Sequence, residues 1–160
     1  MIQPGDHIPS VTIKQAKAEG AADVDPAALF AGKKVVMFSL PGAFTPTCSA
    51  KHLPGYVARY DELRGKGVDL IACLSVNDHF VMQAWAKEHG AEGKIVMLAD
   101  GLGAFTKALG IEADLSGIGL GTRARRGAFL IEDGVVKSAE LEAPGKFEVS
   151  SAEACLVKLS

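Results

Sequence analysis

The sequence predicts an α/β fold in which helices flank a mixed central sheet. Short apolar runs rich in β-branched residues alternate with segments of helical periodicity, which is typical of parallel strands joined by helices. Two later runs flank Asp133-Gly134, a dipeptide typical of a two-residue hairpin, and so add antiparallel strands. The 160 residues contain no repeat or linker, and we expect a single domain over residues 1–160.

The first predicted elements are short. An alternating stretch from His7 to Gln15 is a weak strand candidate. Asp25 precedes Pro26 and can cap a short helix that ends at Gly32. Residues 34–40 are apolar and partly β-branched, as in a buried strand.

A longer helix is predicted to begin near Pro46 or Thr47 and to end at Gly65. Its apolar residues recur at helical spacing: Leu53, Tyr56, Val57, Tyr60 and Leu63. Pro54 lies inside this pattern, so we expect it to kink the helix and to leave the carbonyl of Ala50 without its usual partner.

The remaining elements continue the alternation. We expect strands at residues 68–76, 94–99, 126–132 and 135–142, and a short helix at 103–109. Asn77 or Asp78 can cap the helix that follows the first of these strands and ends at Gly90. The last helix is predicted to begin at Ser150, with Glu153 completing a capping box.

Composition argues against several classes of function. The 17 basic and 19 acidic residues give a net charge of −2, so we expect no nucleic-acid partner. No apolar run is long enough to span a membrane, and the N-terminus does not look like a secretory signal, so we expect a cytoplasmic protein. Three cysteines, without a CxxC pair or a Cys/His cluster, indicate free thiols and predict neither a metal nor a cofactor.

Cys48 is the residue that most suggests chemistry. It follows a predicted strand, a Pro41-Gly42 turn and a Thr45-Pro46 pair, at the expected start of a helix. Helix N-termini present unpaired N–H groups and a positive partial charge, and both favour the nucleophilic thiolate. The residues alone leave two interpretations open, an activated thiol or an inert buried cysteine near a helix start.

The segment PGAFTPTC, from Pro41 to Cys48, resembles the peroxidatic segment of peroxiredoxins, and most of all that of the type II subfamily, also called Prx5. Similar segments continue along the chain at residues 53–55, 72–78, 98–100, 123–126 and 149–153. The resemblance implies a thioredoxin-like fold. It also implies a thiol peroxidase that reduces hydrogen peroxide and alkyl hydroperoxides without metal or haem.

The resemblance also implies roles for particular residues. Cys48 attacks the terminal peroxide oxygen and becomes a sulfenic acid. The hydroxyl of Thr45 could bond both the thiolate and the peroxide, the backbone N–H groups of Thr47 and Cys48 could add to this, and Pro41 would shield the sulfur from water. A guanidinium would stabilise the thiolate and hold the peroxide, and by resemblance it belongs to Arg126.

Arg123 and Arg125 compete with Arg126 for this role. In a strand, Arg126 would share a face with Ala128 while Arg125 would share the other with Gly127, and spacing alone does not choose among the three arginines. Without the resemblance, a solvated basic loop is the simpler interpretation of this cluster.

Other candidates are weaker. Cys73 lies in an apolar strand and Cys155 in the apolar stripe of the last helix, so both are expected in the core, as is Trp85. His52 lies one turn after Cys48, where it is either a base or, more simply, a partly exposed helix residue. Residues 117–121 are glycine-rich and are interpreted as a mobile loop.

Turnover requires a second thiol. Some relatives supply one near the start of the last helix, where Val149 stands here. Cys155 comes six residues later, roughly 9 Å along a helix, whereas a disulfide needs Cα atoms within about 7 Å. We therefore expect a one-cysteine cycle. By resemblance, the reductant is glutathione with glutaredoxin, or else thioredoxin, and the protein is a homodimer.

Two further functions stay open. A binding or chaperone-like protein could use the same fold without turnover, because a fold does not determine a function. A general disulfide oxidoreductase is less favoured because the sequence has no CxxC pair.

Overall fold

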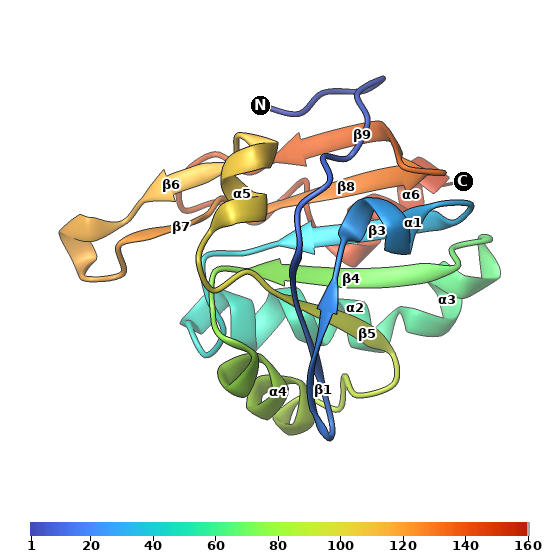
Figure 1. The fold of residues 1–160 in the computed structure, drawn as a ribbon. Helices are drawn as coiled ribbons and strands as arrows, with labels where there is room; N and C mark the ends of the chain where they lie inside the picture. Colours follow the sequence, from blue (N-terminus) through green and yellow to red (C-terminus); the bar gives the residue numbers. More distant parts are fainter. Residues whose placement is uncertain (160) are drawn as a thin grey trace.

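The computed structural model describes residues 1–159, which form a seven-stranded sheet of order β2-β1-β5-β4-β3-β8-β9 (Figure 1). The strands are β1 Ile13–Lys17, β2 Gly20–Val24, β3 Lys34–Ser39, β4 Leu70–Ser75, β5 Ile95–Ala99, β8 Gly127–Glu132 and β9 Val135–Leu141. β4 pairs in parallel with both β3 and β5, and the other neighbours pair antiparallel. The predicted mixed sheet is confirmed.

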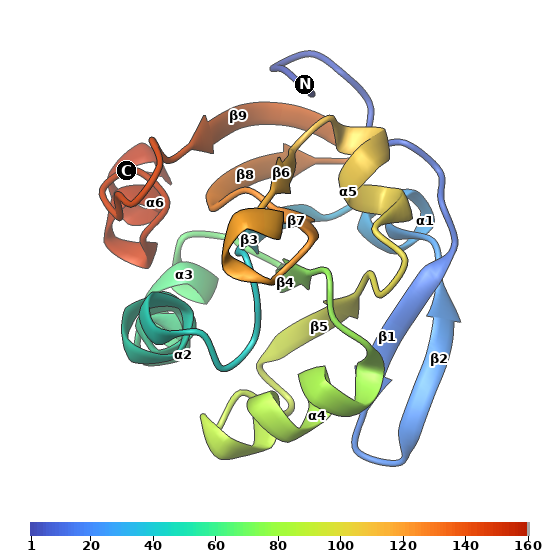
Figure 2. The ribbon, with the colours of Figure 1, turned by 90° about the vertical axis from the view of Figure 1, so that its left-hand side faces the viewer.

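Helices cover both faces of this sheet (Figure 2). They are α1 Pro26–Phe30, α2 Leu53–Ala58, α3 Tyr60–Gly65, α4 His79–Glu88, α5 Ala104–Leu109 and α6 Ala152–Leu159. Successive strand residues point to opposite faces, so Phe38 packs in the core with α2, α4 and α6, while Met37 packs in the core with α1 and α5. None of the helices within residues 1–159 has the length and apolar character needed to cross a membrane.

Local signals in the sequence place most of these elements. The carboxylates of Asp25 and Asp78 accept hydrogen bonds from the backbone N–H groups two and three residues on, at 3.0 and 2.8 Å, and so cap α1 and α4. Asp78, rather than Asn77, is therefore the cap of α4. At the β8–β9 turn both Asp133 and Gly134 have positive φ, at 48° and 75°, as this hairpin requires.

Two segments differ from the predictions. The first strand begins at Ile13 rather than near His7, and it pairs with β2, which the sequence pattern does not predict. The helix expected from Pro46 to Gly65 is divided into a π-helical turn over Cys48–His52, then α2, then α3 after a break at Arg59. The distortion expected at Pro54 thus lies in the preceding turn, where the N–H of Leu53 reaches back five residues to the carbonyl of Cys48.

The predicted capping box of the last helix is wrong. The hydroxyl oxygen of Ser151, not Ser150, accepts from the N–H of Ala154 at 3.1 Å. Glu153 instead pairs with Arg59 at 3.3 Å, so it does not close a box on the helix start. The neighbouring Ser150 is thereby free for a different role, described below.

The glycine-rich segment at 117–121 lies at the tip of a small hairpin of β6 Glu112–Asp114 and β7 Thr122–Ala124, which projects from the body of the molecule (Figure 1). A short 3-10 turn spans Ser116–Ile118. β7 contains Arg123, and Arg125 and Arg126 follow it before β8 begins.

Candidate active site

The fold brings the end of β3 and the start of β8 together. These two strands pair antiparallel, with Ser39 opposite Gly127, so the residues after β3 lie beside the residues before β8. The first group includes Cys48 and the second includes Arg126. Ser39 also ties the two segments directly, because its hydroxyl donates to the carbonyl of Arg125 at 2.7 Å. Two parts of the chain nearly 80 residues apart therefore form one site.

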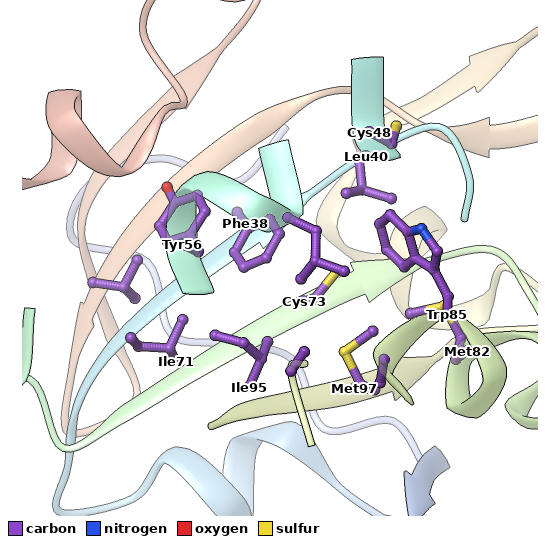
Figure 3. Close-up of a cluster of buried hydrophobic side chains, with 14 of the residues drawn as sticks. Phe38, Leu40, Cys48, Tyr56, Ile71, Cys73, Met82, Trp85, Ile95 and Met97 are labelled. Atoms are coloured by element: carbon purple, nitrogen blue, oxygen red, sulfur yellow. The ribbon is translucent and has the colours of Figure 1, made fainter. Parts of the chain in front are cut away.

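Cys48 is the first residue of the π-helical turn and has no exposed surface. Its side chain lies at the top of the core that contains Leu40 and Trp85 (Figure 3). The loop leading to it is held in an unusual conformation, since Phe44 has a φ of 65°, which non-glycine residues seldom adopt. Gly42 lets Arg123 approach this loop closely, because a Cβ at residue 42 would lie 2.5 Å from a guanidinium nitrogen of Arg123 and would displace that side chain.

The guanidinium of Arg126 contacts Cys48 directly. Its Nη2 atom donates to Cys48 Sγ at 3.1 Å, and its Nη1 atom lies 2.8 Å from Nδ1 of His52. Arg123 turns elsewhere and donates to the carbonyls of Leu120 and Pro41, at 2.9 and 3.1 Å. The structure thus brings Arg126, and neither of its competitors, to the sulfur.

The expectation of a partly exposed His52 is wrong, because its side chain is fully buried. Nε2 lies 3.0 Å from the carbonyl of Ser150, which can only accept, and Nδ1 faces Arg126, which can only donate. The ring is therefore neutral, with its hydrogen on Nε2. Burial and then the charge of Arg126 lower the pKa of His52 to about 3, against the opposing effect of the Ser150 carbonyl. The one free lone pair of the His52 ring, on Nδ1, accepts from Arg126, which argues against a role of His52 as a base.

Behind His52 lies a second polar group that sequence reasoning missed. One carboxylate oxygen of Glu142 accepts from the backbone N–H groups of Glu148, Val149 and Ser150 and from the hydroxyl of Ser150, at 2.7 to 2.9 Å. Burial acts to raise the pKa of Glu142, but these hydrogen bonds outweigh it and the pKa is lowered. The segment so held presents the carbonyl of Ser150 to His52, and also to the hydroxyl of Tyr56 at 2.8 Å.

The other two predicted site residues lie in the loop before Cys48. The hydroxyl of Thr45 donates to the carbonyl of Gly42 at 2.6 Å, which leaves its oxygen able to accept. Within residues 1–159, Thr45 makes no hydrogen bond to Cys48. Pro41 holds Arg123 through its carbonyl and, together with Thr47 and Arg126, lines a cavity of about 340 Å³.

Cys73 and Cys155 lie in the core, as predicted. Both are buried, Cys73 in β4 and Cys155 in α6, where its sulfur is 3.2 Å from the hydroxyl of Tyr56 (Figure 3 shows Cys73 and Tyr56). Burial raises the pKa of each thiol, which disfavours the reactive thiolate. Trp85 is buried as expected, and its ring N–H donates to the hydroxyl of Ser49 at 3.0 Å, which ties α4 to the turn that carries Cys48.

Comparisons with known proteins match nearly the whole chain. A family model described as Redoxin matches residues 3–156. The chloroplastic Peroxiredoxin-2E of Arabidopsis thaliana is 49% identical over 99% of this chain and 69% of its own length. Reduced Prx3 of Vibrio vulnificus, solved in complex with hydrogen peroxide, is 52% identical, with a TM-score of 0.95 over the full length of both chains. Peroxiredoxin 5 of Alvinella pompejana is 39% identical, with a TM-score of 0.86, and the match covers 99% of this chain and 98% of the other.

Proposed function

Because this chain belongs to the redoxin family and is a peroxiredoxin, a thiol-dependent peroxidase of thioredoxin-like fold, we propose that Cys48 is the residue that peroxide oxidises. The observation that carries this proposal is the 3.1 Å contact between Nη2 of Arg126 and Sγ of Cys48. Within residues 1–159, no cationic side chain donates a hydrogen bond to the sulfur of either of the other two cysteines. The non-catalytic binding protein considered above is not favoured.

The reaction follows from the charges. The Cys48 thiolate attacks the terminal oxygen of the hydroperoxide, the S–O bond forms as the O–O bond breaks, and the departing oxygen leaves as alkoxide or hydroxide, which takes a proton. Negative charge moves from the sulfur toward the departing oxygen, so a fixed guanidinium beside both stabilises the transition state. Arg126 is suited to this because His52 holds one of its nitrogens while another faces the sulfur.

Thr45 and Pro41 complete the proposed site. Because Thr45 already donates to Gly42, its oxygen accepts the O–H of the incoming peroxide and orients it toward Cys48. Pro41 has no N–H group and excludes water without hydrogen-bonding to the sulfur. Since Cys48 has no exposed surface, the loop that contains Pro41 and Thr47 moves to admit the peroxide.

The sulfenic acid is reduced by an external thiol. That thiol attacks the oxidised sulfur of Cys48 with loss of water, and a second thiol then releases Cys48 from the mixed disulfide. Cys73 and Cys155 are fixed in the core and do not reach Cys48 without local unfolding. Glutathione with glutaredoxin is the proposed source of electrons, and thioredoxin the second candidate.

The assembly proposed is a homodimer of single-domain chains, each spanning residues 1–160, in the cytoplasm. Its support is a set of exposed apolar side chains at one edge of the sheet. Phe44, Phe80 and Leu102 are 51%, 75% and 98% exposed, and each follows the end of one of the parallel strands β3, β4 and β5. Sedimentation that shows a monomer at micromolar concentration would contradict the dimer.

The peroxidase proposal is tested by substitution of the sulfur. Consumption of hydrogen peroxide is measured in the presence of a thiol reductant for the wild type and for Cys48→Ser. We expect the variant to lose turnover while keeping its fold, whereas equal rates in the two proteins would rule out Cys48.

A further inference from the structure

The cavity beside Arg126 is larger than hydrogen peroxide needs. Its volume is about 340 Å³, and Pro41, Thr47 and Arg126 form part of its lining. A water molecule takes about 30 Å³ of liquid, and hydrogen peroxide, with two heavy atoms, needs roughly the space of two waters. Pockets that bind small organic molecules span roughly 300–1,000 Å³, so this cavity suits a compact organic body.

The walls of the cavity are mainly apolar. The β6–β7 hairpin contributes Ala113, Leu115 and Ala124, and the segment after β9 contributes Ala143 and Pro144. These side chains offer no hydrogen bonds, so the walls favour hydrocarbon over a ligand with many peptide groups.

The charged side chains that line the cavity are predominantly basic. Arg125, Arg126 and Lys146 carry three positive charges and Glu142 one negative charge, a balance of +2 in a chain whose net charge is −2. One oxygen of Glu142 is occupied by four donors, and Arg126 is occupied by Cys48 and His52. Arg125 and Lys146 form no ion pair with any acidic side chain in residues 1–159. They are therefore available to an anionic ligand.

We propose that this cavity binds the organic part of a hydroperoxide that ends in a carboxylate. The hydroperoxide group lies toward Cys48, the hydrocarbon lies along the apolar walls, and the carboxylate meets Arg125 and Lys146. The carboxylate is unchanged by the reaction, in which the hydroperoxide becomes an alcohol as Cys48 becomes a sulfenic acid. This inference rests on the proposed peroxidase function and specifies its substrate class.

A matched pair of substrates tests the role of the charge. The probes are cumene hydroperoxide with a para carboxylate, the methyl ester of the same compound, and hydrogen peroxide. Second-order rate constants for oxidation of Cys48 are measured by stopped flow at low and high ionic strength. We expect the acid to react about threefold to tenfold faster than the ester at low salt, the range of one or two partly exposed ion pairs, and the ratio to fall at high salt.

Variants locate the effect in the cavity. Lys146→Gln and Arg125→Gln should each bring the acid-to-ester ratio toward one. Lys107→Gln, an exposed lysine on α5 outside the cavity, serves as the matched control and should keep the wild-type ratio.

The outcomes separate this inference from the proposed function. A wild type that reduces hydrogen peroxide but does not distinguish acid from ester overturns the inference alone, whereas a wild type that reacts with no hydroperoxide overturns the peroxidase proposal. If Lys146→Gln instead slows reduction of the sulfenic acid by glutathione and leaves the acid-to-ester ratio unchanged, the cavity serves the reducing thiol and the inference is wrong.

Discussion

Nδ1 of His52 lies 2.8 Å from Nη1 of Arg126, and the same guanidinium donates through Nη2 to the sulfur of Cys48. The histidine is held in turn by the carbonyl of Ser150. A neutral imidazole therefore fixes the direction of the arginine without competing for the thiolate. The relationship explains why a histidine one turn after the cysteine is fully buried.

The first prediction concerns this contact. His52→Gln should slow oxidation of Cys48 by hydrogen peroxide about tenfold, because the guanidinium is no longer held in one direction. Oxidation by hydrogen peroxide should slow more than alkylation of Cys48 by iodoacetamide, because only the peroxide reaction has a departing oxygen for the guanidinium to stabilise, and a general loss of structure would not produce this difference. The control is His7→Gln, which changes an exposed histidine near the N-terminus. An unchanged rate of peroxide oxidation in a folded His52→Gln protein would show that the contact does not position Arg126.

His52 also links stability to pH. Its pKa is about 3 in the folded protein, below the ordinary 6.5, so the unfolded chain takes up a proton first as the pH falls below 6.5. The stabilisation of the fold by the neutral His52 ring is thus present in full above pH 6.5 and is lost toward pH 3. Between pH 7 and about pH 4.5 this group alone should lower the free energy of unfolding by roughly 2 to 3 kcal/mol. Urea unfolding of wild type and His52→Gln at both pH values measures it, and equal losses in the two proteins would contradict the assignment.

The arginine cluster gives the third prediction. Arg126→Ala should slow the peroxide reaction by about two to three orders of magnitude, the usual loss when a transition-state donor is removed. Arg123→Ala should cost less, because Arg123 supports the loop through the carbonyls of Leu120 and Pro41 and does not touch the sulfur. Stopped-flow rates decide between them, and a larger loss in Arg123→Ala would reverse the choice of arginine.

Glu142 should act on the site from a distance. Glu142→Ala leaves four donors without their acceptor, so the free energy of unfolding should fall by about 1 to 3 kcal/mol. The peroxide reaction should slow as well, since the carbonyl of Ser150 no longer holds His52. Glu140→Ala, two residues earlier on β9, which removes an exposed pair with Lys158, is the control. Wild-type rates in a destabilised Glu142→Ala protein would limit Glu142 to a structural role.

The last variant tests the one-cysteine cycle. Cys155→Ser should keep turnover with an external thiol, because Cys155 is buried against Tyr56 and its raised pKa keeps it protonated. Loss of turnover in a folded Cys155→Ser protein, or a dominant disulfide between Cys48 and Cys155 after peroxide treatment, would contradict this cycle.

Local signals in the sequence account for much of the fold. Asp25, Asp78 and the Asp133-Gly134 turn each act within a few residues, and each is found where it is predicted. The position of Cys48 at the start of a helical segment is also predictable, because it depends on residues nearby in the sequence. The choice of Arg126 follows only from the family resemblance or from the pairing of β3 with β8, which no local pattern reveals.

The supporting residues behind the arginine could not be predicted for the same reason. Ser150 followed by Glu153 matches a capping box, yet Ser150 is bound to Glu142, eight residues earlier. His52 lies four residues before Tyr56, on the apolar stripe of the predicted helix, so its burial could be read from the spacing, but no local pattern shows the Ser150 carbonyl and the Arg126 guanidinium that bind its ring. Both outcomes depend on contacts between segments far apart in sequence, which outweigh local preference.

The central claim is that Cys48 alone receives the peroxide oxygen, and the species bonded to its sulfur after one turnover tests it most directly. The reduced protein is treated with one equivalent of hydrogen peroxide in the presence of a reagent that traps sulfenic acids, and its cysteine peptides are identified by mass spectrometry. The account predicts a trapped sulfenic acid on Cys48, with Cys73 and Cys155 unmodified. Trapped product on Cys73 or Cys155 while Cys48 remains a free thiol would contradict it.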